Sequence, residues 1–156
     1  MRAMRQTYLT GAKVDALVST IARRAGLSHA AFNALAVIEA GGGPIPVGQV
    51  TAQMHITTAT TTTVLDTLER KGYVRRVPDA TDRRKVLVDI TPQAQATLDE
   101  LLPAVQRALG ETLRDFDDVT LQHLFDTLTR VDAAIDALPD ELPSARRRPP
   151  ARLRRK

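Results

Sequence analysis

Residues 56–91 read ITTATTTTVLDTLERKGYVRRVPDATDRRKVLVDIT, and this stretch is the most informative about the fold. Its first half predicts a helix, because apolar and threonine side chains recur there at the spacing of one helical face. That stripe comprises Thr57, Thr61, Val64, Leu65 and Leu68. Thr57 can also supply the oxygen that caps the helix, and Gly72 can adopt the left-handed conformation that ends it. The helix is therefore bounded at both ends.

Two short strands are expected after the glycine. Residues 73–77 and 86–90 are runs rich in β-branched side chains, and the segment between them, PDATDRRK, holds proline, two aspartates and no large apolar group. This pattern predicts a hairpin with a long polar tip. A helix followed by such a hairpin outlines a winged helix-turn-helix, so the expected fold class is mainly α with a small β-hairpin wing.

The helix face opposite the apolar stripe is a candidate DNA-contacting surface. At 100° per residue it carries Ala59, Thr62, Thr63, Asp66 and Arg70, with Thr58 and Thr60 at its flanks and Thr57 at its start. Small side chains let a helix lie close to base edges. There a threonine hydroxyl can form a hydrogen bond with either a donor or an acceptor group of a base, and its methyl can pack on a thymine methyl. The alternative is a solvated helix of poor intrinsic propensity.

The hairpin tip suggests a second contact with DNA. Arg83, Arg84 and Lys85 bring three positive charges to one turn, and arginine suits a narrow minor groove of strongly negative potential. Asp82 can accept hydrogen bonds from the Arg84 guanidinium and so fix the turn. The alternative is an ordinary charged hairpin tip.

These residues resemble the MarR family of bacterial transcription regulators. The match is carried by LDTLERKGYVRR at 65–76 and PDATDRRKVLVDIT at 78–91, and it extends more loosely over residues 3–139. The resemblance implies a cytoplasmic homodimer that binds a pseudo-palindromic operator, acts as a repressor, and releases the DNA when a small molecule binds.

The resemblance also implies roles for individual residues. Arg84 matches the wing arginine that enters the minor groove, Asp82 matches the acidic residue that orients it, and Thr62 and Thr63 fall where the family's recognition helix reads bases. Many members carry an arginine where this chain has Thr63, which argues for readout through hydroxyl, methyl and DNA shape. An effector, of which small aromatic or phenolic compounds are the family's common sort, is expected near Tyr8, Arg24, His29 and Phe32.

Length and composition fit one small cytoplasmic protein. The chain has 156 residues, 43% of them hydrophobic, and no cysteine, so a disulfide scaffold and thiol-based peroxide sensing are excluded. No segment approaches the roughly 18 apolar residues that span a membrane, and the N-terminal residues lack the apolar core of a signal peptide.

The positive charge is concentrated at one end. Residues 146–156 hold seven of the 22 basic residues and no acidic one, which leaves residues 1–145 with 15 positive and 18 negative charges. This proline-rich tail should be disordered. It is either an arm that strengthens binding to any DNA or a solubilising terminus.

The flanking segments predict dimerisation helices that form a shared two-fold interface. The alternative is that they pack back on the winged domain as the core of a monomer. Apolar side chains recur at helical spacing in about 4–25, after Thr91 and Pro92, and after Asp117 or Asp118. Upstream of the central stretch, Ser28 caps a helix reaching Ala40, Ile45 is a short strand, and Val47–Met54 is the supporting helix. The expected organisation is an N-terminal dimerisation helix (1–26), the winged domain (27–91), C-terminal dimerisation helices (92–139) and a disordered basic tail (140–156).

An enzyme is not expected. The three histidines, His29, His55 and His123, share no metal-ligand spacing, and the sequence has no GxGxxG, GxxxxGK or GxSxG motif. We therefore predict neither a cofactor nor a metal. Two hypotheses remain: a ligand-responsive regulator, and an effector-independent DNA-organising protein with largely non-specific binding. They differ in the ratio of specific to non-specific affinity.

Overall fold

The computed structural model describes residues 1–79, 82 and 85–138. They form two compact units, one ending at Leu113 and the other beginning at Arg114, which are described separately. The elements are α1 (Arg2–Ala22), the 3₁₀ helix η1 (Arg23–Ala25), α2 (His29–Ala40), β1 (Ile45–Pro46), α3 (Val47–Met54), α4 (Thr58–Arg70), β2 (Val74–Pro78), β3 (Val86–Ile90), α5 (Pro92–Leu113) and α6 (Asp118–Asp136). The predicted fold class, helices around a small winged sheet, is confirmed.

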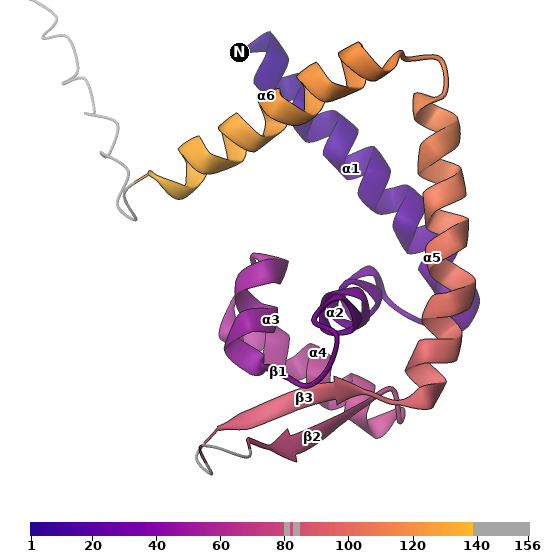
Figure 1. Ribbon diagram of the computed structural model, residues 1–156, viewed down its shortest axis with the longest axis vertical. Coiled ribbons are helices and arrows are strands. Elements are labelled where there is room, and N and C mark those ends of the chain that lie inside the picture. Colours follow the sequence, from indigo (N-terminus) through magenta and orange to yellow (C-terminus); the bar gives the residue numbers. More distant parts are fainter. Residues whose placement is uncertain (80–81, 83–84, 139–156) are drawn as a thin grey trace, which may run out of the picture. The chain divides into compact units, whose positions relative to one another are not determined.

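The first unit contains the winged domain. Its antiparallel sheet has the order β1-β3-β2, with Ile45 opposite Val88 and Arg76 also opposite Val88 from the other side. Helices α2, α3 and α4 pack together beside the sheet, and the β2–β3 hairpin extends from them (Figure 1). The largest fully buried side chains of this core are Leu35, Ile38, Leu65, Leu68, Leu98, Val50, Val88 and Thr61.

Local chemistry sets the ends of α4. Thr57 accepts a hydrogen bond from the Thr60 N–H at 3.2 Å, as predicted for the N-cap. Gly72 has φ +76°, the left-handed conformation predicted for the stop. One expectation was wrong: Thr57 is exposed and does not join the apolar stripe. A capping side chain turns back toward the first helical turn, so it cannot also point at the core.

The second strand begins one residue later than predicted. The N–H of Tyr73 donates to the Leu68 carbonyl at 2.9 Å, which completes the helix end before the strand starts at Val74. The predicted third strand, 86–90, is confirmed.

Helix α5 belongs to the same core as the winged domain. Its buried residues Ala94, Leu98 and Leu101 join the main apolar cluster. Thr91 caps it by accepting from the Ala94 N–H at 3.3 Å, and the Thr91 hydroxyl donates to the Gly72 carbonyl at 2.7 Å. These bonds fasten the start of α5 to the end of α4.

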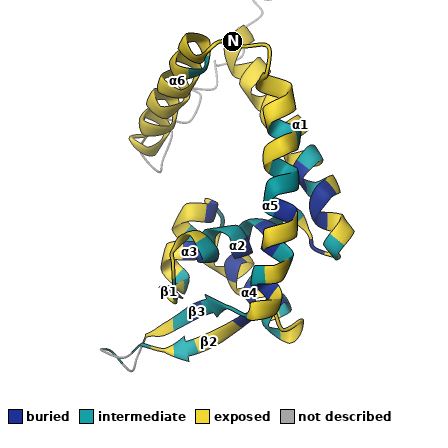
Figure 2. Cartoon of the chain, turned by 45° about the vertical axis from the view of Figure 1, so that its right-hand side comes forward, coloured by how far each residue is buried: buried dark blue, intermediate teal, exposed yellow. Residues whose placement is uncertain are grey.

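Helix α1 packs on α5 and α2 through its C-terminal part, where Val18, Ile21 and Ala22 are buried. Residues 2–16 of the same helix are all exposed, including Met4 at 74% and Tyr8 at 77%. Figure 2 shows this change from exposed to buried along α1.

The second unit is described as one helix, α6, which begins at its predicted cap. Asp117 accepts a hydrogen bond from the Thr120 N–H at 2.8 Å. None of its residues is buried: Leu121 is half-buried, and every other residue of the helix is exposed (Figure 2). The predicted tail, 140–156, lies outside the described residues.

Candidate DNA interface

The outer face of α4 is exposed as the helical period predicted. Each of the residues predicted on that face or at its start is exposed: Thr57, Thr58, Ala59, Thr60, Thr62, Thr63, Asp66 and Arg70. Thr61, by contrast, is completely buried, and Leu65 and Leu68 lie with it on the core side. The threonine run therefore divides between two faces, with one member in the core and the others outside.

The outward threonines use their hydroxyl protons within the helix. Thr62 donates to the carbonyl of Thr58 at 2.9 Å, and Thr63 donates to the carbonyl of Ala59 at 3.1 Å. Thr60 shares a hydrogen bond with the capping Thr57 hydroxyl at 2.8 Å. Such bonds back onto the preceding turn are a known habit of threonine in helices.

A pair of hydroxyl groups links α3 to α4. Thr51 donates to the Thr61 hydroxyl at 3.0 Å, and Thr61 donates to the Thr57 carbonyl at 3.2 Å. The contact joins the two helices of the helix-turn-helix where Thr61 is buried and Thr51 is half-buried. It fixes the angle at which α4 is presented.

An arginine on β2 holds two carboxylates of α4. The Arg76 guanidinium donates to Asp66 at 2.6 Å and also to Glu69. The hydrogen bond with Asp66, opposed by partial burial and supported by the charge of Glu69, raises the pKa of Arg76 above its ordinary value. This Arg76 cluster, consisting of Arg76, Asp66 and Glu69, ties α4 to β2, the first strand of the wing.

The Arg76 cluster changes the interpretation of Asp66. Sequence reasoning placed Asp66 among the DNA contacts, but its carboxylate is engaged by Arg76. Arg70 is similarly engaged, because its guanidinium donates to the Thr67 hydroxyl at 3.2 Å and to the Asp66 carbonyl at 3.4 Å. Both side chains make contacts within the protein surface.

The wing is organised at its base. The Asp82 N–H donates to the Asp79 carboxylate at 3.2 Å, and the Lys85 N–H donates to the Asp82 carbonyl at 2.9 Å. The Lys85 ammonium lies 3.9 Å from the Asp82 carboxylate. The predicted contacts of Arg83 and Arg84, including the pairing of Arg84 with Asp82, lie outside the described residues.

Sequence reasoning missed two further contacts of basic residues. Arg75 binds Asp89 across the hairpin at 2.6 Å. Lys71 donates from its ammonium to the Gly26 carbonyl at 3.2 Å, which ties the end of α4 to the turn between η1 and α2. Strand alternation offered one signal, since neighbouring arginines must point to opposite faces of β2 and one of them must face α4. Nothing local pointed to Gly26, which lies 45 residues away.

The residues expected to bind an effector do not gather in one place. A cavity of about 610 Å³ lies between α1 and α5. Arg24 lines it, whereas Phe32 is buried in the main core, Tyr8 lies on the exposed part of α1, and the His29 ring lies 3.9 Å from Asp15. Of the four expected residues, only Arg24 therefore contributes to this cavity.

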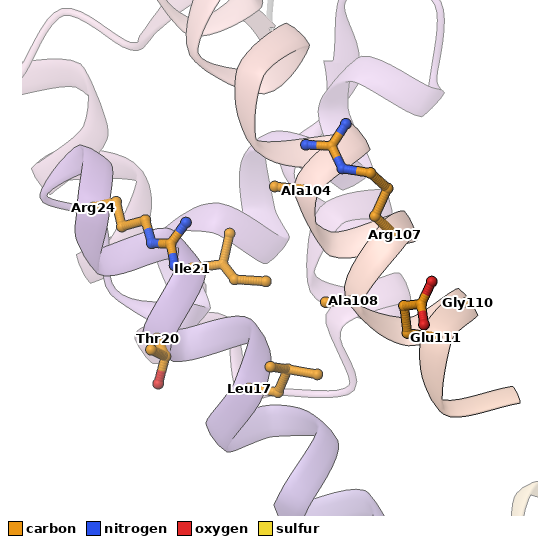
Figure 3. Close-up of a pocket in the computed structure, with 9 residues that line it drawn as sticks. All are labelled: Leu17, Thr20, Ile21, Arg24, Ala104, Arg107, Ala108, Gly110 and Glu111. Carbon is orange, nitrogen blue, oxygen red and sulfur yellow. The ribbon is translucent and has the colours of Figure 1, made fainter.

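The cavity joins apolar walls to cationic edges. Figure 3 shows Leu17 and Ile21 extending from α1 toward α5, where Ala104 and Ala108 face them. Arg24 stands on one side of the cavity and Arg107 on the other. The remaining residues that line the cavity are Thr20, Gly110 and Glu111.

The sequence profile of the MarR family matches residues 25–85, from the end of η1 into the wing. In this segment the chain resembles the MarR family. Among curated relatives of this chain, the transcriptional regulator PecS of Dickeya dadantii (strain 3937) is 27% identical over 121 residues, covering 76% of this chain and 73% of PecS. The uncharacterised regulator YsmB of Bacillus subtilis (strain 168) is 28% identical over 76 residues, and the aligned part spans 49% of this chain and about half of YsmB, 52%. The transcriptional repressor YetL of the same organism is 28% identical over 94 residues, or 60% of this chain and 56% of YetL. These relatives are regulators, not enzymes.

Solved structures share the fold over most of this chain. A MarR-family regulator from Silicibacter pomeroyi superposes with a TM-score of 0.76 at 26% identity, covering 87% of this chain and 91% of that one. A mutant of MarR from E. coli in complex with operator DNA gives a TM-score of 0.75 at 23% identity, covering 84% of this chain and 94% of the MarR chain. CouR from Rhodococcus jostii RHA1 bound to p-coumaroyl-CoA gives a TM-score of 0.74 at 23% identity, covering 80% of this chain and 87% of CouR.

The described residues hold neither a membrane-spanning helix nor a metal-binding cluster. No helix in residues 1–79, 82 and 85–138 has the length and apolar character needed to cross a membrane. In the same part of the chain, no group of three or more histidine, aspartate or glutamate side chains is arranged to hold a metal ion.

Proposed function

We propose that this protein is a cytoplasmic transcription regulator that binds a pseudo-palindromic operator as a homodimer, with α4 in the major groove. The observation that carries the proposal is the outer face of α4. Its first turns are exposed and have only small side chains, and the start of the helix is capped. Such a surface reaches base edges closely, and a helix N-terminus also favours phosphate. The bound state of the E. coli MarR mutant, a protein of the same fold, supports this use of the surface.

The wing supplies the second contact in this proposal. Lys85 and the sequence positions Arg83 and Arg84 bring positive charge to the hairpin, and we assign them to the minor groove beside the major-groove site of α4. The Arg76 cluster supports the pairing of the two contacts, because it fastens the wing strand β2 to the recognition helix.

The exposed apolar side chains support a dimer. On α6, Leu124 is 46% exposed, Phe125 64% and Ile135 58%, and they belong to one stripe along the helix. Soluble proteins rarely leave such a stripe bare, because covering it stabilises an assembly by about 25 cal/mol per Å² of apolar surface. A two-fold axis through the terminal helices would place two copies of α4 about one DNA turn apart.

We place the effector in the cavity between α1 and α5. Its volume of about 610 Å³ falls in the range of small-molecule sites, about 300–1,000 Å³. Apolar walls flanked by Arg24 and Arg107 suit an anionic compound with an apolar body. Because α1 leads directly into the turn that Lys71 contacts, an occupant of the cavity can alter the position of α4. In this proposal the regulator is a repressor, and binding of the effector releases the operator.

The deciding experiment is binding selection from fragmented genomic DNA at about 0.15 M salt, where weak phosphate contacts are already screened. Enrichment of a pseudo-palindromic site supports a regulator. Uniform recovery of all fragments overturns the proposal and favours the effector-independent DNA-organising protein. Sedimentation at micromolar concentration tests the dimer separately, and a monomer there would contradict the two-fold architecture.

A further inference from the structure

The first two turns of α4 lack the side chains that read guanine. Positions 58–63 are TATTTT, with no arginine, lysine, asparagine or glutamine. Arginine and lysine are the usual partners of guanine, and asparagine and glutamine bind adenine through two hydrogen bonds. The first cation on the helix, Arg70, is at its last position and is already bonded to Thr67. Whatever this surface reads, it reads through threonine and alanine.

The structure also limits what those threonines can donate. The hydroxyl protons of Thr62 and Thr63 are directed at the carbonyls of Thr58 and Ala59, at 2.9 Å and 3.1 Å. A hydroxyl has one proton and two lone pairs, so each oxygen remains able to accept a hydrogen bond. Both residues are exposed, so their methyl groups also remain available on the outer face. Ala59, one helical turn before Thr63, adds a further methyl to the same surface.

We propose that α4 selects A·T base pairs, with Ala59, Thr62 and Thr63 packing on thymine methyl groups and the Thr62 and Thr63 oxygens accepting from adenine amino groups. The inference rests on the proposed operator binding and adds the class of base that is read. In the major groove both A·T and G·C pairs present one amino donor and two acceptors, and only the A·T pair adds a methyl group. The accepting oxygens of α4 can therefore meet either amino group, and its methyl surface favours A·T.

The test begins with selection of binding sites from a random duplex library at about 0.15 M salt. We expect T·A or A·T pairs at the positions under α4 in both half-sites. Replacing one contacted thymine by deoxyuridine, which removes only the methyl group, should weaken binding about fourfold, the effect that burial of a single methyl group gives. Guanines under α4 whose replacement by 7-deazaguanine weakens binding would overturn the inference, because they would show readout of an acceptor.

Protein variants identify the residues responsible. Thr62→Ser and Thr63→Ser keep the hydroxyl and remove the methyl, so the matching thymine and deoxyuridine sites should bind them equally. Thr62→Val keeps a methyl and removes the acceptor, so it should keep the preference for thymine. Thr67→Ser is the matched control, because Thr67 makes the same backward bond, to the Thr63 carbonyl at 2.9 Å, but is half-buried at the side of the helix.

The outcomes separate this inference from the proposed function. If no sequence is enriched, operator binding itself fails, and the inference fails with it. If a site is enriched but deoxyuridine binds as well as thymine at every position under α4, the regulator stands and methyl readout is refuted. If Thr67→Ser abolishes the preference as fully as Thr62→Ser and Thr63→Ser do, the assignment to the outer face is refuted.

Discussion

Breaking the Arg76 cluster tests whether the wing and the recognition helix act as one unit. The perturbation is a double-mutant cycle of Arg76→Met and Asp66→Asn. The Arg76, Asp66 and Glu69 side chains are 32%, 51% and 38% exposed, so water still solvates the carboxylates once the arginine is gone. The penalty of a buried, unpaired charge is therefore avoided, and only the pair interactions are lost.

The size of the effect follows from those exposures. A partly exposed ion pair contributes about 0.5–1 kcal/mol, so the two bridges of Arg76 together stabilise the fold by about 1–2 kcal/mol. For a chain of this size Arg76→Met should then lower Tm by about 3–6 °C. The coupling between Arg76 and Asp66 alone should be about 0.5–1 kcal/mol. Urea unfolding at one fixed protein concentration measures the free energy of unfolding of the wild type, the two single variants and the double variant.

The direction in which Asp66→Asn changes DNA affinity provides a second test. If Asp66 merely faced the phosphates, Asp66→Asn would remove a repulsive charge and raise affinity for every DNA. If Asp66 positions the wing through Arg76, the same change should lower the ratio of specific to non-specific affinity. Arg75→Met is the charge-matched control, because Arg75 binds Asp89 within the hairpin and not α4. The reasoning is refuted by a coupling below about 0.3 kcal/mol, within the error of additivity, or by equal losses of specific affinity in Arg75→Met and Arg76→Met.

Three other changes probe the fold. Leu98→Ala should destabilise the protein by about 2–5 kcal/mol, because Leu98 is fully buried where α5 meets the winged domain; a cost below about 1 kcal/mol in urea unfolding would contradict that packing. Gly72→Ala should cost about 1 kcal/mol, since φ is +76° and an added Cβ would lie 3.1 Å from the Gln93 Oε1 atom; unchanged stability would contradict the left-handed stop. Hydrogen bonds from Thr120 lower the pKa of Asp117, so the charged form favours the α6 cap. That contribution is complete above about pH 4 and is lost as the pH falls through the lower folded pKa. The protection of amides at the start of α6, measured as their exchange rate relative to the unstructured chain at the same pH, should therefore fall in acid in the wild type and much less in Asp117→Asn. An equal fall in both would refute the charged cap.

The elements and their ends could be predicted from the sequence, because the signals for them are local. A threonine cap at its start and a left-handed glycine after its end define the bounds of α4. The helical spacing of its apolar residues separates the outer face from the side that carries Leu65 and Leu68. The hairpin of β2 and β3 is equally local, since β-branched runs around a polar segment specify it. The MarR resemblance was likewise carried by one continuous stretch of sequence.

Tertiary packing sets what the charged and hydroxyl groups do, because their partners lie on other elements. Arg76 turns toward Asp66 and Glu69 of α4 only once β2 has packed beside that helix, and Lys71 meets Gly26 across 45 residues. The same packing buries Thr61 against Thr51 and separates Phe32 from Arg24. Periodicity along one element fixes which way a side chain points, but its partner depends on the relative placement of two elements, which only the folded core sets.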